Sequence, residues 1–154
     1  MWQRIQSVFL LLAAIALCLL FLPIMSFISI SGSQAALQQA EVGMLADGVL
    51  NINDQIIFQI LTVLGAVASI VAIFMFKNRS LQVSLSRLTL VASILIMVLS
   101  GVFFYLDYQL IEANTLISGD FGLLSPVLGI VCSILAIRNI KKDDHLVKSS
   151  DRLR

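Results

Sequence analysis

Long apolar runs constrain this chain more than any other feature. Four of them, at about 8–30, 56–76, 88–106 and 121–140, have roughly the 20 residues that a helix needs to cross a bilayer. All 10 lysines and arginines lie in segments that can share one side of a membrane. This segregation is what the positive-inside bias produces. We therefore predict an all-α fold, a four-helix transmembrane bundle with both termini in the cytoplasm.

The composition leaves no room for a separate soluble domain. The chain has 154 residues, of which 59% are hydrophobic and 12% are charged, whereas soluble domains carry about 25% charged residues. We predict a single integral membrane domain over 1–154, with a cytoplasmic tail at 141–154. The basic residues are thinly spread and lack interleaved aromatics, so nucleic acid is not an expected partner.

The first apolar run and the connection after it need separate treatment. The run at 8–30 is longer than the 7–15 residues of a signal peptide, so we expect a retained helix that bends at Pro23. In the connection at 31–55, the sequence favours a short helix at about 34–46. The end of this connection, residues 48–54, can alternatively be extended.

The residue pattern does not point to catalysis, a metal site or a cofactor. Ionisable groups at membrane depth are costly and therefore conspicuous, and none lies in the middle of the four runs. The only histidine, His145, lies in the charged tail, away from the serines of the runs. We predict a protein that is not an enzyme. The least favoured alternative is an enzyme that acts at the outer interface through Asp54, Asp107 or Asp120.

Small residues at four-residue spacing indicate helix-packing faces. In lipid, such stripes let helix backbones approach closely because there is no large side chain between them. The candidates are Gly65 and Ser69 in the second run, and Ser125, Gly129 and Ser133 in the fourth. The partner can be another span of this chain, a different membrane protein or a second copy of the chain.

Two further sets of polar residues are candidates for binding. Gln59, one turn inside the second run, is either a ligand contact or, as we favour, an interhelical hydrogen bond. Basic residues form a predicted cytoplasmic surface that sets the topology and contacts lipid headgroups, or alternatively docks a partner. They are Lys77, Arg79, Arg87, Arg138, Lys141 and Lys142.

Three stretches carry a family resemblance: WQRIQSVFLLLAA at the start, FKNRSLQ after the second run, and KKDDHLVKSSDRLR at the end. In this order, together with the four runs, they resemble a family of small four-span inner-membrane proteins of Bacteroidota, known as a domain of unknown function. His145 stands where an acidic residue is expected. The resemblance implies a multi-pass protein of the bacterial inner (cytoplasmic) membrane, and it brings no activity, substrate or cofactor.

These observations favour a non-catalytic accessory or scaffold subunit of a membrane complex. The expected partners are membrane lipids and either another membrane protein or further copies of the chain. The alternative is a binder or carrier of a lipid or small apolar ligand, with a groove near Pro23 and Gln59.

Overall fold

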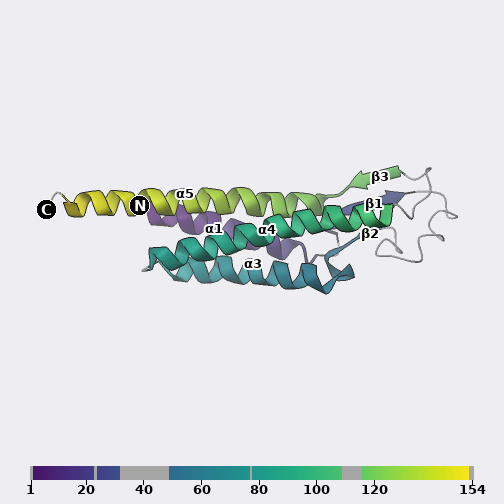
Figure 1. Cartoon of the computed structure of the whole chain (residues 1–154), viewed down its shortest axis with the longest axis horizontal. Coiled ribbons are helices and arrows are strands. Elements are labelled where there is room, and N and C mark those ends of the chain that lie inside the picture. Colours follow the sequence, from purple (N-terminus) through teal and green to yellow (C-terminus); the bar gives the residue numbers. More distant parts are fainter. Residues whose placement is uncertain (1, 23, 32–48, 77, 109–115, 153–154) are drawn as a thin grey trace.

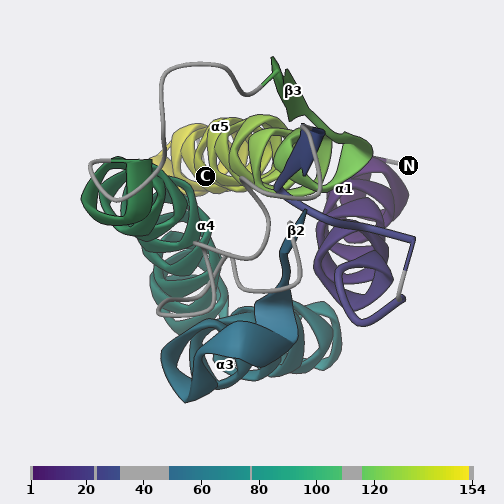
Figure 2. The same ribbon diagram turned by 90° about the vertical axis from the view of Figure 1, so that its right-hand side faces the viewer.

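Four long helices form a bundle in this computed structural model, which describes residues 2–22, 24–31, 49–76, 78–108 and 116–152. The helices are α1 (Trp2–Leu19), α3 (Ile56–Phe74), α4 (Arg79–Tyr108) and α5 (Leu124–Arg152) (Figure 1). Viewed end-on, they form a ring in which α1 and α4 each pack against both α3 and α5 (Figure 2). The predicted all-α four-helix bundle is confirmed.

The bundle is apolar outside, and inside it small and hydroxyl side chains lie among large apolar ones such as Leu17 and Ile96. Its exposed positions include many leucine, isoleucine and valine side chains, whereas buried positions include Thr62, Ser69, Thr89 and Ser93. Hydroxyls can be buried here because each donates to a backbone carbonyl of its own helix, as Ser93 Oγ does to the Thr89 carbonyl at 2.9 Å. Three helices, α3, α4 and α5, are long and apolar enough to cross a membrane. The chain is therefore a multi-pass membrane protein.

The first helix differs from the prediction of a span at 8–30. It begins at Trp2 and ends at Leu19, and its apolar part, Ile5–Leu19, is shorter than the other three helices. A proline at position 23 cannot donate to the carbonyl of Leu19, and it disfavours helical backbone at the preceding residue. The chain therefore leaves the helix through tight turns, such as the bond from the Leu22 N–H to the Leu19 carbonyl at 3.0 Å. The prediction of one bent but continuous helix over 8–30 is therefore wrong.

A small antiparallel sheet closes the end of the bundle away from the start of α1 (Figure 1). Its strand order is β2 (Val49–Leu50), β1 (Ile28–Ser31) and β3 (Leu116–Gly119), with Ile28 opposite both Leu50 and Gly119. This sheet was not predicted as such, although the extended end of the long connection agrees with β2. The predicted short helix at 34–46 lies outside the described residues.

Two short 3-10 turns lead from this sheet into the bundle. They are η1 (Ile52–Asp54), before α3, and η2 (Phe121–Leu123), before α5. Beneath the sheet, the Phe58 ring lies 5.3 Å from the Phe27 ring and 5.6 Å from the Phe103 ring, measured between centroids. The largest apolar core therefore lies at the sheet end.

The helices α4 and α5 both extend beyond the predicted spans. The segment expected to be a turn before residue 88 is helical from Arg79, with Asn78 at its start accepting a hydrogen bond from the Leu81 N–H at 3.4 Å. At the other end of the chain, α5 continues without a break through the predicted tail to Arg152. Both basic segments are therefore held on helices rather than on flexible connections.

Candidate functional site

The small residues of α3 face α4 and α1 within the same chain. A Cβ added at Gly65 would lie 2.9 Å from Leu17 Cδ1 and 3.3 Å from Ala92 Cβ. The Ser69 hydroxyl donates to the Gly65 carbonyl at 3.0 Å and lies 3.0 Å from the Thr89 hydroxyl of α4. The α3 stripe is therefore occupied by contacts inside the bundle.

The small residues of α5 are also buried in the bundle. Ser125 Oγ donates to the Ala16 carbonyl of α1. A Cβ at Gly129 would lie 2.7 Å from the Ser93 hydroxyl oxygen of α4. Ser133 is fully buried, and its hydroxyl has no hydrogen-bond partner among the described residues. Since both stripes pack inside this chain, a partner protein must use another surface.

Gln59 lies at the sheet end of α3, partly exposed. Its Nε2 donates to Asn53 Oδ1 in η1 at 3.3 Å. The amide therefore joins the start of α3 to the turn before it, and the predicted bond to another long helix is not found among the described residues. Pro23, the other residue of the predicted ligand groove, lies outside the described residues.

Two carboxylates of the alternative enzyme prediction hold local structure at the sheet end. Asp120 Oδ2 accepts a hydrogen bond of 2.6 Å from the Ser26 hydroxyl. Asp54 Oδ2 accepts one of 2.5 Å from the Asn51 N–H. The side chain of Asp107 lies outside the described residues. Across the residues that the structure describes, no group of three His, Cys, Asp or Glu side chains could hold a metal ion.

The basic residues predicted to form one surface are divided by the structure. Arg87, Arg138, Lys141 and Lys142 are exposed, and Lys77 lies outside the described residues. Arg79 instead points toward α5, where its Nη2 lies 3.3 Å from Asp143 Oδ2 and its Nη1 lies 3.9 Å from Asp144 Oδ1. The Arg79 guanidinium is thus held between α4 and α5 by carboxylates.

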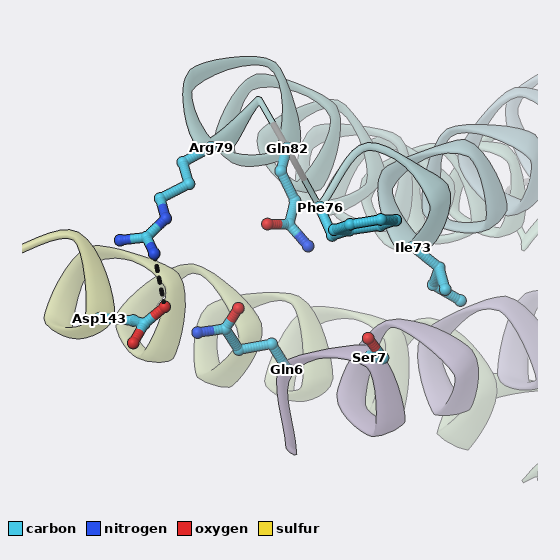
Figure 3. A pocket seen from close by; sticks show the side chains of 7 residues that line it. All are labelled: Gln6, Ser7, Ile73, Phe76, Arg79, Gln82 and Asp143. Atoms are coloured by element: carbon cyan, nitrogen blue, oxygen red, sulfur yellow. Dashed lines mark ion pairs between the residues drawn. The ribbon is translucent and has the colours of Figure 1, made fainter. Parts of the chain in front are cut away.

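Arg79 lines a polar cleft at the end of the bundle opposite the sheet, with a volume of about 320 Å³ (Figure 3). All four helices or their ends contribute to it. The lining residues are Gln6 and Ser7 of α1, Ile73 of α3, Phe76 just after α3, Arg79 and Gln82 of α4, and Asp143 of α5. The cleft therefore exists only in the assembled bundle.

Two glutamines give the cleft its polar walls. Gln6 and Gln82 are only 4% and 3% exposed, and they point toward one another across the cleft (Figure 3). Gln6 Nε2 donates to the Asn139 carbonyl of α5 at 3.1 Å. The side-chain amide of Gln82 makes no hydrogen bond to any part of the chain that the structure describes. Because Gln82 lines the cleft, its amide is open to a ligand there.

Arg79 also keeps an unused donor in this region. Its Nη1 is buried and has no hydrogen-bond partner among the described residues, since 3.9 Å to Asp144 is too long for a hydrogen bond. The cleft is thus lined by the Arg79 guanidinium, the Gln82 carboxamide and the Asp143 carboxylate. These groups bind by charge and hydrogen bonding.

The sequence prediction missed Gln6, Gln82 and Asp143 as site residues. A signal for Gln82 exists in the spacing of polar residues along α4, at positions 79, 82, 86, 89 and 93. Spacings of three and four place these residues on one helix face, and polar faces in membrane helices turn toward the bundle interior. For Gln6 and Asp143 no comparable local pattern exists, because each joins the cleft through contacts between different helices.

Comparison with known proteins shows the family of this chain. A family model described as Domain of unknown function (DUF4293) matches residues 2–153, and the chain belongs to this family. Among curated proteins and among solved structures, no match was found. The resemblance to a family of unknown function is therefore confirmed, while the assignment to Bacteroidota stays a prediction.

Proposed function

We propose that this member of the family is a non-catalytic accessory subunit of a membrane complex in the inner membrane of Bacteroidota, with both termini in the cytoplasm. The observation that carries the proposal is the free-standing end of α5, which projects past the ends of the other three helices (Figure 1). At a rise of 1.5 Å per residue, the part from His145 to Arg152 extends about 12 Å. A rigid helix of this kind suits contact with a protein outside the bilayer.

The chemistry of this projecting part supports a protein partner. Leu146 and Val147 are 51% and 42% exposed, and charged residues occupy both sides of them in the sequence. Exposed apolar side chains within a charged surface are typical of protein contacts. Because both small-residue stripes are buried in the bundle, the end of α5 is the surface that we assign to the partner.

The arrangement of the charges supports the orientation. The start of α1, the end of α5 and the start of α4 lie at one end of the bundle, and the basic residues Arg79, Lys141 and Lys142 lie there as well (Figure 1). The opposite end carries the sheet, with Asp54 and Asp120. By the positive-inside bias, the basic end faces the cytoplasm.

Accessibility of single cysteines tests this orientation. In a background in which Cys18 and Cys132 are replaced by alanine, Ser149→Cys and Ser118→Cys provide exposed reporters at opposite ends. We expect a membrane-impermeant maleimide, added to spheroplasts with an intact inner membrane, to label Ser118→Cys only. Labelling of Ser149→Cys under the same conditions would contradict the orientation.

Purification from native membranes tests the accessory role. The full chain and a variant that ends at Asp144 are extracted in mild detergent, and the co-purifying proteins are quantified by mass spectrometry. We expect one protein in stoichiometric amount with the full chain, and its loss from the truncated chain. A matched control is Val131→Ala, which alters an exposed apolar residue in the part of α5 that belongs to the bundle.

Several outcomes would contradict this proposal. A full chain without a stoichiometric protein partner removes its basis, and a partner that remains bound to the truncated chain contradicts the assignment to α5. If the partner is a second copy of the chain, native mass spectrometry shows a dimer that the truncation dissociates, which supports the homo-oligomer form of the hypothesis.

A second candidate function, the binding of a lipid or small apolar ligand, is favoured by a groove between α1 and α5. The groove has a volume of about 340 Å³ and is lined mainly by apolar side chains, including Ile15, Leu19, Phe121 and Leu128. Its walls suit one acyl chain, since apolar surfaces of this kind pack hydrocarbon without polar contacts.

The carrier hypothesis predicts a lipid that remains bound through purification. Leu128→Trp would fill the groove, whereas Val131→Trp places the same bulk on an exposed position of α5 that does not line it. We expect loss of a stoichiometric co-purifying lipid in the first variant only. Equal lipid content in both variants would contradict a specific groove site.

A further inference from the structure

The polar cleft lies at the level where the apolar helices end. Ile73 and Phe76 come from the last turn of α3 and the residues just after it, and Arg79 begins α4. Both helices are long enough to cross a bilayer, so this level corresponds to the lipid headgroups. With about 320 Å³, the cleft falls in the size range of about 300–1,000 Å³ that is usual for small-ligand sites.

Two residues of α4, Arg79 and Gln82, bring hydrogen-bond donors to the cleft. Gln82 is 3% exposed and points into the cleft, and its side-chain amide makes no hydrogen bond with the described residues (Figure 3). The Arg79 side chain is 26% exposed and pairs with Asp143 across the cleft. The two residues lie one turn apart on the same helix.

The charges around the cleft restrict the kind of ligand. One guanidinium, that of Arg79, faces two carboxylates, those of Asp143 and Asp144, at 3.3 and 3.9 Å. A simple anion that approached Arg79 would also meet these two negative charges, and a simple cation would leave the Arg79 and Gln82 donors unused. A zwitterion with adjacent negative and positive groups satisfies both requirements.

We propose that this cleft binds a phosphoethanolamine group. The phosphate oxygens accept hydrogen bonds from the Arg79 guanidinium and the Gln82 amide, and the ammonium group donates to the Asp143 carboxylate. Ile73 and Phe76 provide the apolar wall at which the acyl chains of an aminophospholipid leave the site. This binding does not depend on the accessory role proposed above.

Native mass spectrometry of the full chain in detergent tests the site with defined lipids. The probes are dioleoyl phosphatidylethanolamine, dioleoyl phosphatidylglycerol and dioleoyl phosphatidylcholine, with soluble phosphoethanolamine in a separate arm. We expect the ethanolamine lipid to bind about tenfold more tightly than the other two, a preference that corresponds to about one charge-assisted hydrogen bond. Equal affinity for the glycerol lipid would overturn the proposal.

Matched variants connect this preference to the cleft. Arg79→Gln and Gln82→Met each remove one phosphate donor, and we expect each to weaken binding of the ethanolamine lipid by about tenfold. Arg87→Gln removes the same charge from an exposed position on the same helix, so we expect it to bind as the unaltered chain does. Similar binding by the Arg79 and Arg87 variants would contradict the site.

Two further comparisons show whether the bound phosphoethanolamine group belongs to a lipid or to a soluble molecule, and whether its ammonium group contributes to binding. Competition by soluble phosphoethanolamine, lost in Gln82→Met, supports the site with a soluble ligand, whereas binding of the lipid alone supports it with a membrane ligand. Asp143→Asn removes the partner of the ammonium, so we expect it to abolish the preference for ethanolamine over glycerol. If that preference survives in a folded Asp143→Asn variant, the ammonium contact is wrong and the zwitterion proposal is rejected.

Discussion

The two ends of this bundle treat their polar groups in opposite ways. At the sheet end, the Ser26 hydroxyl donates to Asp120 at 2.6 Å, and the Ser26 carbonyl accepts from the Gly122 N–H at 2.9 Å. At the basic end, Arg79 Nη1 is buried without a hydrogen-bond partner among the described residues, and the Gln82 amide, which lines the cleft, makes no hydrogen bond with them. The same four helices meet at both ends, yet only at the sheet end do the polar groups named here find partners within the chain.

This difference separates a structural role from a binding role. Polar groups that serve folding alone are expected to be satisfied within the chain, because an unsatisfied buried group opposes folding. Natural proteins depart from this rule mainly where function requires it. The sheet end therefore fixes the arrangement of the helices, and the basic end is the place to look for a ligand.

The largest expected effect tests the packing on which both ends depend. Gly129→Leu should destabilise the protein by about 3 kcal/mol, because even a Cβ at this position would meet the Ser93 hydroxyl of α4 at 2.7 Å. Ile130→Leu, on the neighbouring face of α5, keeps volume and should cost less than about 1.5 kcal/mol. Thermal unfolding in detergent measures both. Equal melting temperatures would show that the α5 stripe does not hold the helices together.

The next effect concerns the closed end. In Gly122→Ala, the new methyl group would overlap the backbone carbonyl of Ser26, which cannot move without disturbing β1, so we expect a loss of about 2–3 kcal/mol. Gly101→Ala is the control, since nothing lies within 4 Å of a Cβ there. The same thermal assay should show no loss in this control. A similar decrease in both variants would mean that the close approach at residue 122 is not the cause.

A pair of polar-to-apolar replacements compares the two ends directly. Ser26→Ala should destabilise the protein by about 1–2 kcal/mol, because it removes the hydrogen bond that the Ser26 hydroxyl donates to the Asp120 carboxylate. Gln82→Met should be neutral or stabilising in lipid-free detergent, because it removes a buried group that has no partner to lose. A destabilised Gln82→Met variant would show that the amide is satisfied in the protein, and the contrast between the ends would disappear.

The smallest effect comes from the ion pair at the basic end. Arg79→Gln removes the contact with Asp143, and because both side chains remain partly exposed, we expect a change of only about 0–1 kcal/mol. The stability difference from the unaltered chain should shrink in high salt, which thermal unfolding over a salt series can measure. A large, salt-independent loss would instead indicate that Arg79 holds the fold, as Ser26 does at the other end.

Much of the helical architecture could be predicted, and the errors have local physical causes. The second span, expected at 56–76, is found at Ile56–Phe74, because its ends coincide with a change from apolar to polar residues. The first span was placed too far along the chain, since hydropathy counts residues up to Ile30 as membrane helix while Pro23 ends the helix. Polar residues after Asn78 concealed the early start of α4, in which Gln82 and Ser86 are buried while Ser80, Ser84 and Arg87 are exposed.

The candidate site was less predictable than the fold. Arg79 was identified only as one of several basic residues, and its direction separates it from exposed Arg87. A helix face can be inferred from spacing, but the neighbour that this face meets depends on how four helices rotate and cross. Gln6 donates to Asn139 across 133 positions in the sequence, a contact without any local signature.

By itself, the sequence determined that this protein is a bundle of apolar helices with its basic residues gathered at one end. In a bilayer, backbone groups must be bonded within the segment, so an apolar run without a proline in its middle, such as the one that forms α3, favours a helix whatever its neighbours are. Only the tertiary structure decided that β1 pairs with β2 and β3, and that α4 and α5 bring Arg79 to Asp143. These contacts join distant parts of the chain, and packing between helices, rather than local pattern, selects which side chains meet.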